Sequence, residues 1–177
     1  DNARNAQTFT ITKSRFEPTM HGTTQSNSEN IDWETPKSGN FGKENWGLKQ
    51  LIEWYDLKLD VCAKDQLRSC CTRFYTEEQT YKEPWDVNFF MNPPWKTVIM
   101  EKMLLRVIDQ CQTYHIIGVC LLPSYTGADF FHELVTAAGA TITPIWGRVK
   151  YWCYGEPHPG SPNIDSIIAI YHYAEVK

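Results

Sequence analysis

The sequence predicts an α/β fold in which a mostly parallel β-sheet is covered by helices and closed by an antiparallel edge. Short apolar runs typical of buried strands alternate along the chain with segments whose apolar residues recur at helical spacing. Such alternation favours parallel strands joined by covering helices. The last two apolar segments, 141–152 and 164–173, follow one another without a helical pattern between them, so we expect them to form an antiparallel pair at the mixed edge of the sheet.

The first half of the predicted sheet contains one helix and two strands. Aromatic and aliphatic residues three and four positions apart predict a helix across roughly 43–55. The short apolar runs 57–63 and 87–91 predict buried strands. The segment 64–85 between them is mostly polar, and we expect a surface loop there.

The second half contains two more helices and the central strand. Apolar residues at helical spacing predict an amphipathic helix across 96–112. The run 116–122 is continuously apolar, which is typical of a strand buried on both faces. A further helix is expected around 130–135, with Gly139 as its stop.

Two regions are predicted along the chain. Residues 1–30 are rich in Ser, Thr, Asn and Gln and poor in large apolar side chains, so we expect a polar tail or arm. Residues 31–177 are expected to form one catalytic domain, and a chain of 177 residues is long enough to bury a core of its own.

Composition and charge exclude several classes of protein. No stretch is apolar enough to span a bilayer and no signal-peptide core is present, so we expect an intracellular, soluble protein. A net charge of −4 argues against a nonspecific DNA coat, although an enzyme on DNA needs only a local basic patch. The six cysteines include no C-x-x-C pair, so we expect reduced thiols and no metal site.

The run Asn92-Pro93-Pro94-Trp95 directly follows the predicted strand 87–91. Each proline fixes its own φ and restricts the residue before it, so the run is stiff. It holds the Asn92 amide and the carbonyls of Asn92 and Pro93 in one direction, with an indole alongside. This arrangement suits a flat aromatic ring that bears an amino group; the alternative is a proline-rich strand exit with a surface tryptophan.

Asp60 lies within the predicted strand 57–63, where an unpaired carboxylate is costly to bury. Either it accepts hydrogen bonds from a ligand or it caps a nearby turn. Ligands of open α/β sheets bind at the carboxyl ends of the strands, and Asp60 and Asn92 both fall at or near such ends.

Eight short motifs follow one another between residues 32 and 166. They are Asp32-Trp33-Glu34-Thr35-Pro36, Leu59-Asp60-Val61-Cys62-Ala63, Phe74-Tyr75, Trp85, Asn92-Pro93-Pro94-Trp95, Leu121-Leu122-Pro123, Trp146-Gly147-Arg148-Val149 and Asn163-Ile164-Asp165-Ser166. In these motifs and in their order, the chain resembles the phage-type DNA adenine-N6 methyltransferase (Dam) family over about residues 32–173.

The resemblance implies a Rossmann-like, single-domain fold that uses S-adenosylmethionine as its cofactor. It implies that Asn92, Pro93, Pro94 and Trp95 hold the target adenine, which is flipped out of the duplex. For the cofactor, it favours a set of residues near the strand ends and before the first helix. These are Asp60, Ala63, Asp86, Trp33, Thr35 and Pro36. The chain lacks the glycine-rich loop of many methyltransferases, a lack that the phage-type family shares.

Basic and aromatic residues in two segments are candidates for DNA contact. Arg73 and Tyr75 lie in the polar segment 64–85, where arginine suits phosphates and tyrosine suits base stacking. Arg148 and Lys150 fall on one face of an alternating strand, before a Gly- and Pro-rich hairpin tip. A solvated surface and a structural hairpin are the respective alternatives.

The function expected from the resemblance is transfer of a methyl group from S-adenosylmethionine to N6 of adenine in DNA, in the cytoplasm of a bacterial host. Two alternatives stay open. One is a methyltransferase for another planar amine or amide, such as protein glutamine or an RNA base. The other is a non-catalytic nucleic-acid-binding relative. The sequence indicates neither the DNA site nor the oligomeric state.

Overall fold

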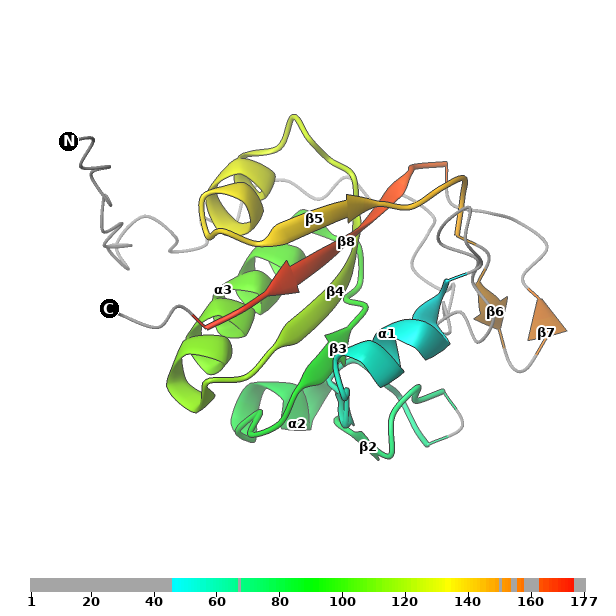
Figure 1. Cartoon of the computed structure of the whole chain (residues 1–177), viewed down its shortest axis with the longest axis vertical. Coiled ribbons are helices and arrows are strands. Elements are labelled where there is room, and N and C mark those ends of the chain that lie inside the picture. The colour runs from blue at the N-terminus through cyan, green and yellow to red at the C-terminus, as the bar shows by residue number, and fades with distance from the viewer. Residues whose placement is uncertain (1–45, 67, 150, 154–155, 158–162, 174–177) are drawn as a thin grey trace.

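The structure is a computed structural model that describes residues 46–66, 68–149, 151–153, 156–157 and 163–173 (Figure 1). The expected polar arm at 1–30 lies outside these residues. So do the predicted site residues Trp33, Thr35, Pro36 and Lys150.

A six-stranded mixed sheet forms the centre of the fold (Figure 1). In spatial order its strands are β2 (Arg73–Phe74), β1 (Leu59–Asp60), β3 (Phe89–Met91), β4 (Gly118–Pro123), β8 (Ser166–Tyr171) and β5 (Thr141–Pro144). The first four run parallel, and β8 is antiparallel to both β4 and β5. The predicted α/β class, the parallel strands and the antiparallel closing pair are confirmed. The last strand nevertheless lies inside the sheet, between β4 and β5.

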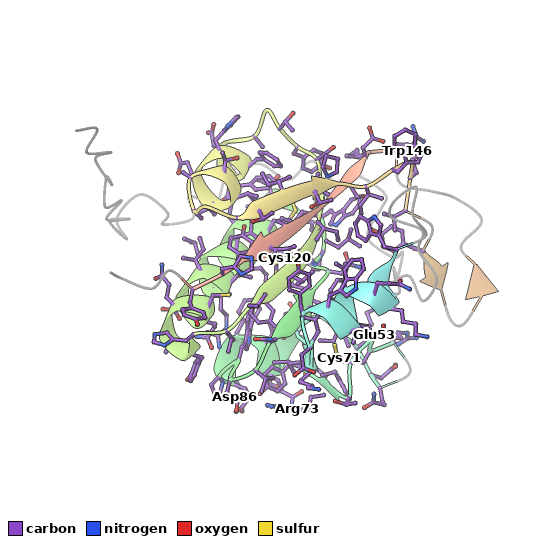
Figure 2. All side chains as sticks on the ribbon, viewed as in Figure 1. Glu53, Cys71, Arg73, Asp86, Cys120 and Trp146 are labelled. Carbon is purple, nitrogen blue, oxygen red and sulfur yellow. The ribbon has the colours of Figure 1, made fainter. Side chains whose placement is uncertain are left out.

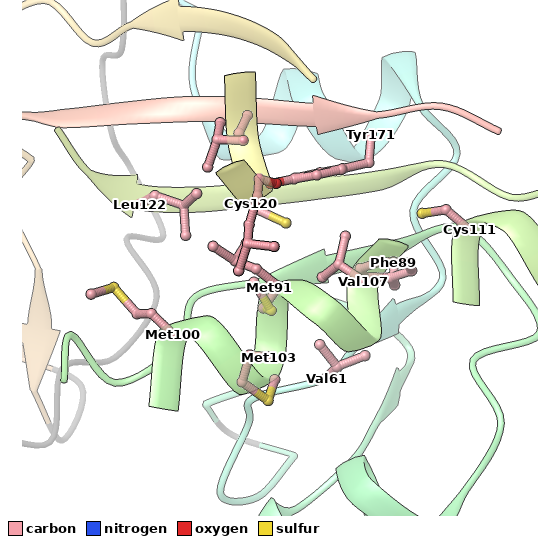
Figure 3. Close-up of a cluster of buried hydrophobic side chains, with 14 of the residues drawn as sticks. Val61, Phe89, Met91, Met100, Met103, Val107, Cys111, Cys120, Leu122 and Tyr171 are labelled. Carbon is pink, nitrogen blue, oxygen red and sulfur yellow. The ribbon is translucent and has the colours of Figure 1, made fainter. Parts of the chain in front are cut away.

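Alternating side chains give the sheet two buried faces. Phe89 and Met91 of β3 point into the core beneath α3 (Thr97–Tyr114) and the π-helix η2 (Phe131–Thr136), whereas Phe90 points to the opposite face. That opposite face is covered by α1 (Leu48–Trp54) and by Ile145, Val149 and Tyr151. Figure 3 shows the core between α3 and the sheet, where methionines and branched side chains fill the space.

Helix α3 follows its predicted position closely. Its buried residues recur at helical spacing, and they are Met100, Met103, Leu104, Val107, Gln110 and Cys111. The helix ends at His115, which adopts the left-handed conformation with φ 54°. Gln110 is tied to the segment before β3, because its Oε1 accepts the backbone N–H of Trp85 at 2.8 Å.

The segment 64–85 differs from its prediction as a surface loop. It contains strand β2 and the short helix α2 (Glu77–Lys82). Helix α2 begins with a reciprocal cap in which the Gln79 side chain accepts the N–H of Thr76. Buried Thr80 joins α2 to the end of β1, since its hydroxyl donates to the carbonyl of Val61.

Other elements are shorter than the sequence patterns predict. The run 57–63 gives only the two-residue strand β1, because the chain turns directly after Asp60. The expected hairpin near 146–162 appears as the short antiparallel pair β6 (Trp152–Cys153) and β7 (Glu156–Pro157). In the part of the chain that the structure describes, no helix is both long and apolar enough to cross a bilayer.

Candidate active site

The strand order predicts a ligand site between the carboxyl ends of β1 and β3. The chain runs from β1 outward to β2, then returns past β1 to β3 and onward to β4. In doubly wound sheets with this order, the crevice forms where the direction reverses, at the carboxyl ends of the two strands. Here those ends are Asp60 and Met91, and Asn92 follows directly.

The Asn92–Trp95 run connects β3 to α3 in a few residues. Asn92 and Trp95 are half-buried, Pro93 is buried and Pro94 is exposed. The backbone N–H of Lys96 donates to the Pro94 carbonyl at 2.9 Å, which closes a tight turn before α3. The two prolines stiffen the strand exit, so the Asn92 amide is held at the sheet edge.

Trp95 is supported by an aromatic residue from a distant part of the chain. Its ring meets the buried Tyr151 ring edge-on, with centroids 6.1 Å apart and an interplanar angle of 81°. Trp95 also packs against the buried residues of both faces of the sheet. The indole is therefore held in place on its inner side, while part of it reaches solvent.

The carboxylate of Asp60 is held by the loop that follows its strand. One oxygen accepts the N–H of Cys62 at 3.1 Å and the other accepts the N–H of Cys70 at 3.2 Å. The residue is only 1% exposed, and burial raises the pKa of its carboxyl more than these bonds lower it. This geometry agrees with the turn-capping alternative: Asp60 organises the loop 61–71 at the ligand edge.

Cys62 lies next to Asn92, although sequence reasoning assigned it no role. The backbone N–H of Asn92 donates to its sulfur, and burial raises the pKa of the thiol well above its ordinary value. A thiol that stays protonated is a poor nucleophile. Ala63, a predicted cofactor residue, is buried in the same turn. The ends of β1 and β3 are thus in contact through Cys62.

Arg73, Tyr75 and Asp86 form a separate cluster. The Arg73 guanidinium donates to Asp86 Oδ1 at 3.0 Å and to the Tyr75 hydroxyl at 3.2 Å. Asp86 precedes β3, whereas Asn92 follows it, so the strand separates the two. Figure 2 shows Arg73 and Asp86 together, away from Trp146. The backbone N–H of Tyr75 donates to the Asp60 carbonyl at 2.8 Å, so Tyr75 follows β2 at the same edge of the sheet as Asp60, while its hydroxyl lies with Arg73. The functional roles of Arg73, Tyr75 and Asp86 stay predictions.

Arg148 lies in a segment that reaches the same edge as Asn92. Pro144 at the end of β5 pairs with Ile167, and Pro123 at the end of β4 pairs with Ser166. The carboxyl ends of β4 and β5 are therefore adjacent across β8. The chain beyond β5 presents Trp146 and Arg148 as exposed residues there. Sequence reasoning quoted Trp146 within a motif but gave it no role.

A cavity of about 360 Å³ lies between α1 and the loop that Asp60 holds. This volume is in the range of small-molecule sites. The cavity combines apolar, charged and hydroxyl-bearing side chains. Its lining residues are Leu48, Lys49, Ile52, Glu53, Arg68, Ser69 and Cys70. Among the described residues, no three His, Cys, Asp or Glu side chains are grouped as a metal site requires.

Comparison with known proteins finds one family. The family model described as DNA N-6-adenine-methyltransferase (Dam) matches residues 22–171. No curated protein matches the chain, and no solved structure does.

Proposed function

We infer that this chain, which belongs to the DNA N-6-adenine-methyltransferase (Dam) family, transfers the methyl group of S-adenosylmethionine to the N6 amino group of adenine in DNA. The family as a whole comprises DNA N6-adenine methyltransferases. The observation that carries the proposal is the position of Asn92–Trp95 at the carboxyl end of β3, beside the reversal point of the sheet. The proposed catalytic domain is residues 31–177, with a Rossmann-like methyltransferase fold.

The target adenine binds in a pocket formed by the Asn92–Trp95 run. Inside a duplex its amino group is shielded, so the base is flipped out at a cost of a few kcal/mol. Asn92 Oδ1 and the Pro93 carbonyl accept the two amino hydrogens. These bonds draw the nitrogen toward tetrahedral geometry and free the lone pair that ring conjugation otherwise delocalises. The catalytic effect is mainly orientation and stabilisation of the charge that develops on the nitrogen.

Trp95 provides the stacking surface for the flipped base. Stacking of one base on an aromatic side chain is worth ~1–3 kcal/mol. The edge-on contact with buried Tyr151 supports the use of this ring, because an indole held on one side loses little further freedom when a base stacks on it.

The residues at the strand ends fit S-adenosylmethionine in their chemistry. The cofactor supplies an electrophilic methyl group on a sulfonium centre. The carboxylate of Asp60 holds the backbone N–H groups of Cys62 and Cys70, and Ala63 is buried next to Cys62 in the chain. In this proposal Trp33, Thr35 and Pro36 contribute the aromatic and hydroxyl contacts. Cys62 takes no covalent role, since its thiol stays protonated at neutral pH.

The experiment that tests the proposal measures transfer of labelled methyl from S-adenosylmethionine to unmethylated DNA, followed by nucleoside analysis. We expect N6-methyladenine. Labelled glutamine in protein or a labelled RNA base would identify the first alternative. A protein that binds DNA but neither binds the cofactor nor transfers methyl groups would be the non-catalytic relative.

A further inference from the structure

Two adjacent thiols near α1 take no part in the proposed methyl transfer. The sulfurs of Cys70 and Cys71 lie 3.6 Å apart, in hydrogen-bond contact. Two sulfurs bound to one tetrahedral zinc ion, at about 2.3 Å each, lie about 3.8 Å from one another. The two thiols therefore already have the spacing at which a single atom can bond to both.

The pair is poorly placed to form a disulfide of its own. The Cα atoms of adjacent residues are about 3.8 Å apart across a trans peptide, whereas most disulfides join Cα atoms about 4.4–6.8 Å apart. A disulfide between neighbours in the chain is therefore strained and easily reduced. Cys70 and Cys71 are both free thiols in the structure, and both sulfurs are available to a ligand.

The loop around the pair fixes its backbone. The N–H of Cys70 donates to Asp60 Oδ2 at 3.2 Å. The N–H of Cys71 donates to Ser69 Oγ at 3.1 Å, and its carbonyl accepts a bond from Gln66 Nε2 at 3.3 Å. A ligand that bonds to both sulfurs thus meets a preorganised pair and has to order little of the chain.

The cavity between α1 and this loop gives a ligand access to the pair. Cys70 lines this cavity of about 360 Å³, and Cys71 is buried next to it in the chain. Leu48 and Ile52 of α1 form an apolar part of the wall, which suits a hydrocarbon group. Glu53 of the same helix and Cys71 lie in the same part of the molecule in Figure 2. The ligand that fits combines a thiol-binding atom with an apolar group.

The surroundings of the pair disfavour a metal ion. A structural zinc ion takes four protein ligands, and among the residues that the structure describes no three His, Cys, Asp or Glu side chains are grouped for such an ion. The hydrogen bond with Cys71 and burial raise the pKa of the Cys70 thiol well above its ordinary value, whereas metal ions bind thiolates. Trivalent arsenic that carries one organic group differs on both counts, because it forms only two further bonds and condenses with thiols.

We propose that Cys70 and Cys71 form a binding site for organic trivalent arsenicals of the type R–As=O, with the organic group in the cavity beside α1. Two As–S bonds form, while the As=O bond and the two S–H bonds break. The oxygen leaves as water with the two thiol protons, and arsenic stays trivalent, so no oxidant or reductant is required. Because the N–H of Cys70 is bonded to Asp60, the bound arsenical is attached to the loop at the carboxyl end of β1.

Phenylarsine oxide, added at one equivalent to the reduced 177-residue chain, tests the proposal. Mass spectrometry should show one phenylarsenic group gained and two hydrogens lost. The bound arsenical should protect Cys70 and Cys71 of the parent from alkylation by iodoacetamide, as peptide mapping measures. Cys70→Ser keeps one of the two sulfurs and should weaken binding by about 100-fold to 10,000-fold, the usual advantage of a second linked contact.

Cys111→Ala is the matched control. Cys111 is also a buried thiol, but it lies on α3 in the core on the opposite face of the sheet from Cys71. Its loss should leave the affinity within about twofold of the parent value, because distant sites act independently.

Protection of other cysteines in place of Cys70 and Cys71 would overturn the proposal on the parent protein alone. Equal affinities of Cys70→Ser and the parent would overturn it too. Equal protection by zinc ions would show that further ligands complete a metal site, and would overturn the choice of a two-sulfur ligand. The test uses neither DNA nor S-adenosylmethionine, so its outcome is separate from that of the proposed methyl transfer.

Discussion

At the scale of single residues, the proposed chemistry depends most on the side-chain amide of Asn92. Its backbone N–H binds the Cys62 sulfur, which leaves the side chain as the group directed at a ligand in our proposal. The prolines that follow restrict its backbone, so a replacement at this position changes the side chain more than the fold.

Asn92→Ala should lower kcat for methyl transfer by about a hundredfold or more, because one acceptor for the developing charge is lost. Cofactor affinity measured by calorimetry should stay within about twofold of the parent value. Parallel losses of cofactor binding and of activity would show that Asn92 belongs to the cofactor site and not to the target base.

Because Asp60 is buried, we expect its contribution to the stability of the fold to decrease as the pH rises. Folding raises the pKa of its carboxyl above the ordinary value of 3.8, so the folded chain holds this proton more tightly than the unfolded chain does. The corresponding stability is present at low pH and is lost as pH rises through the raised pKa. Asn at this position does not titrate.

The free energy of unfolding of the parent, relative to Asp60→Asn, should therefore fall as the pH rises above the ordinary carboxyl pKa of 3.8. A constant difference is added to this trend, because asparagine offers one acceptor for the two amides of Cys62 and Cys70. Urea unfolding of both proteins over this range measures the trend. An increase of the difference with pH would show that the carboxyl pKa is lowered by folding.

Sequence reasoning located Asn92 and Trp95 at a strand exit because prolines act on the backbone next to them. It left open what Asp60 binds, since one of its partners, Cys70, lies ten residues away and is placed by the fold. The support of Trp95 by Tyr151 was equally out of reach, because the two are 56 positions apart in the chain and meet only after the sheet has formed.

At the scale of elements, the short helix α2 is attached to the site by one hydroxyl. The Thr80 hydroxyl donates to the carbonyl of Val61, at the end of β1, and the Thr80 carbonyl accepts the indole N–H of Trp85 at 3.1 Å. The tie holds the turn in which Cys62 and Ala63 lie.

Thr80→Val keeps the shape of the side chain but leaves the buried Val61 carbonyl without this donor. The expected cost is about 1–3 kcal/mol of unfolding free energy, measured in urea. Thr113→Val on the exposed side of α3 is the control, and it should stay within about 0.5 kcal/mol of the parent. Equal effects at the two positions would mean that the hydroxyl of Thr80 contributes nothing to stability.

The contact between β3 and β4 depends on a glycine. A Cβ added at Gly118 would lie 2.4 Å from Cζ of the fully buried Phe89 ring. Gly118→Ala should therefore destabilise the fold by about 1–3 kcal/mol, since the ring has no room to move in the core. At Gly127 an added Cβ meets nothing within 4 Å, and Gly127→Ala is the matched control in thermal unfolding. A small effect at both glycines would show that the core beside Phe89 can yield.

Elements with strong local patterns were predictable, and those that depend on neighbours were not. The periodic spacing of α3 is a property of its own residues, so its position followed from the sequence. Strand β2 has two residues, with Arg73 exposed and Phe74 half-buried, and it exists because β1 provides the hydrogen bonds. A polar segment of this kind shows no strand pattern before the sheet is known.

At the scale of the whole molecule, the proposed function requires a chain with a net charge of −4 to bind DNA through a local basic surface. Arg148 lies exposed at the edge that contains Asn92, whereas the Arg73 guanidinium is paired with Asp86 elsewhere. The proposed DNA surface therefore includes Arg148 and does not include Arg73.

Arg148→Ala should weaken DNA binding and reduce the slope of log affinity against log salt concentration by about 1, the value for one phosphate contact. Arg73→Ala should leave that slope unchanged. Titrations at several salt concentrations measure both variants. A reduced slope for Arg73→Ala alone would place the DNA on the opposite edge of the sheet.

The central position of β8 has a consequence for the order in which the protein can be made. Strands β4 and β5 are synthesised before β8, which is residues 166–171, but each of them pairs with it. In a nascent chain that ends before these residues, the edges of β4 and β5 that face β8 are unpaired. Unpaired edges of apolar strands can pair with other chains. The ribosome must therefore deliver residues 166–171 before the sheet can close between β4 and β5.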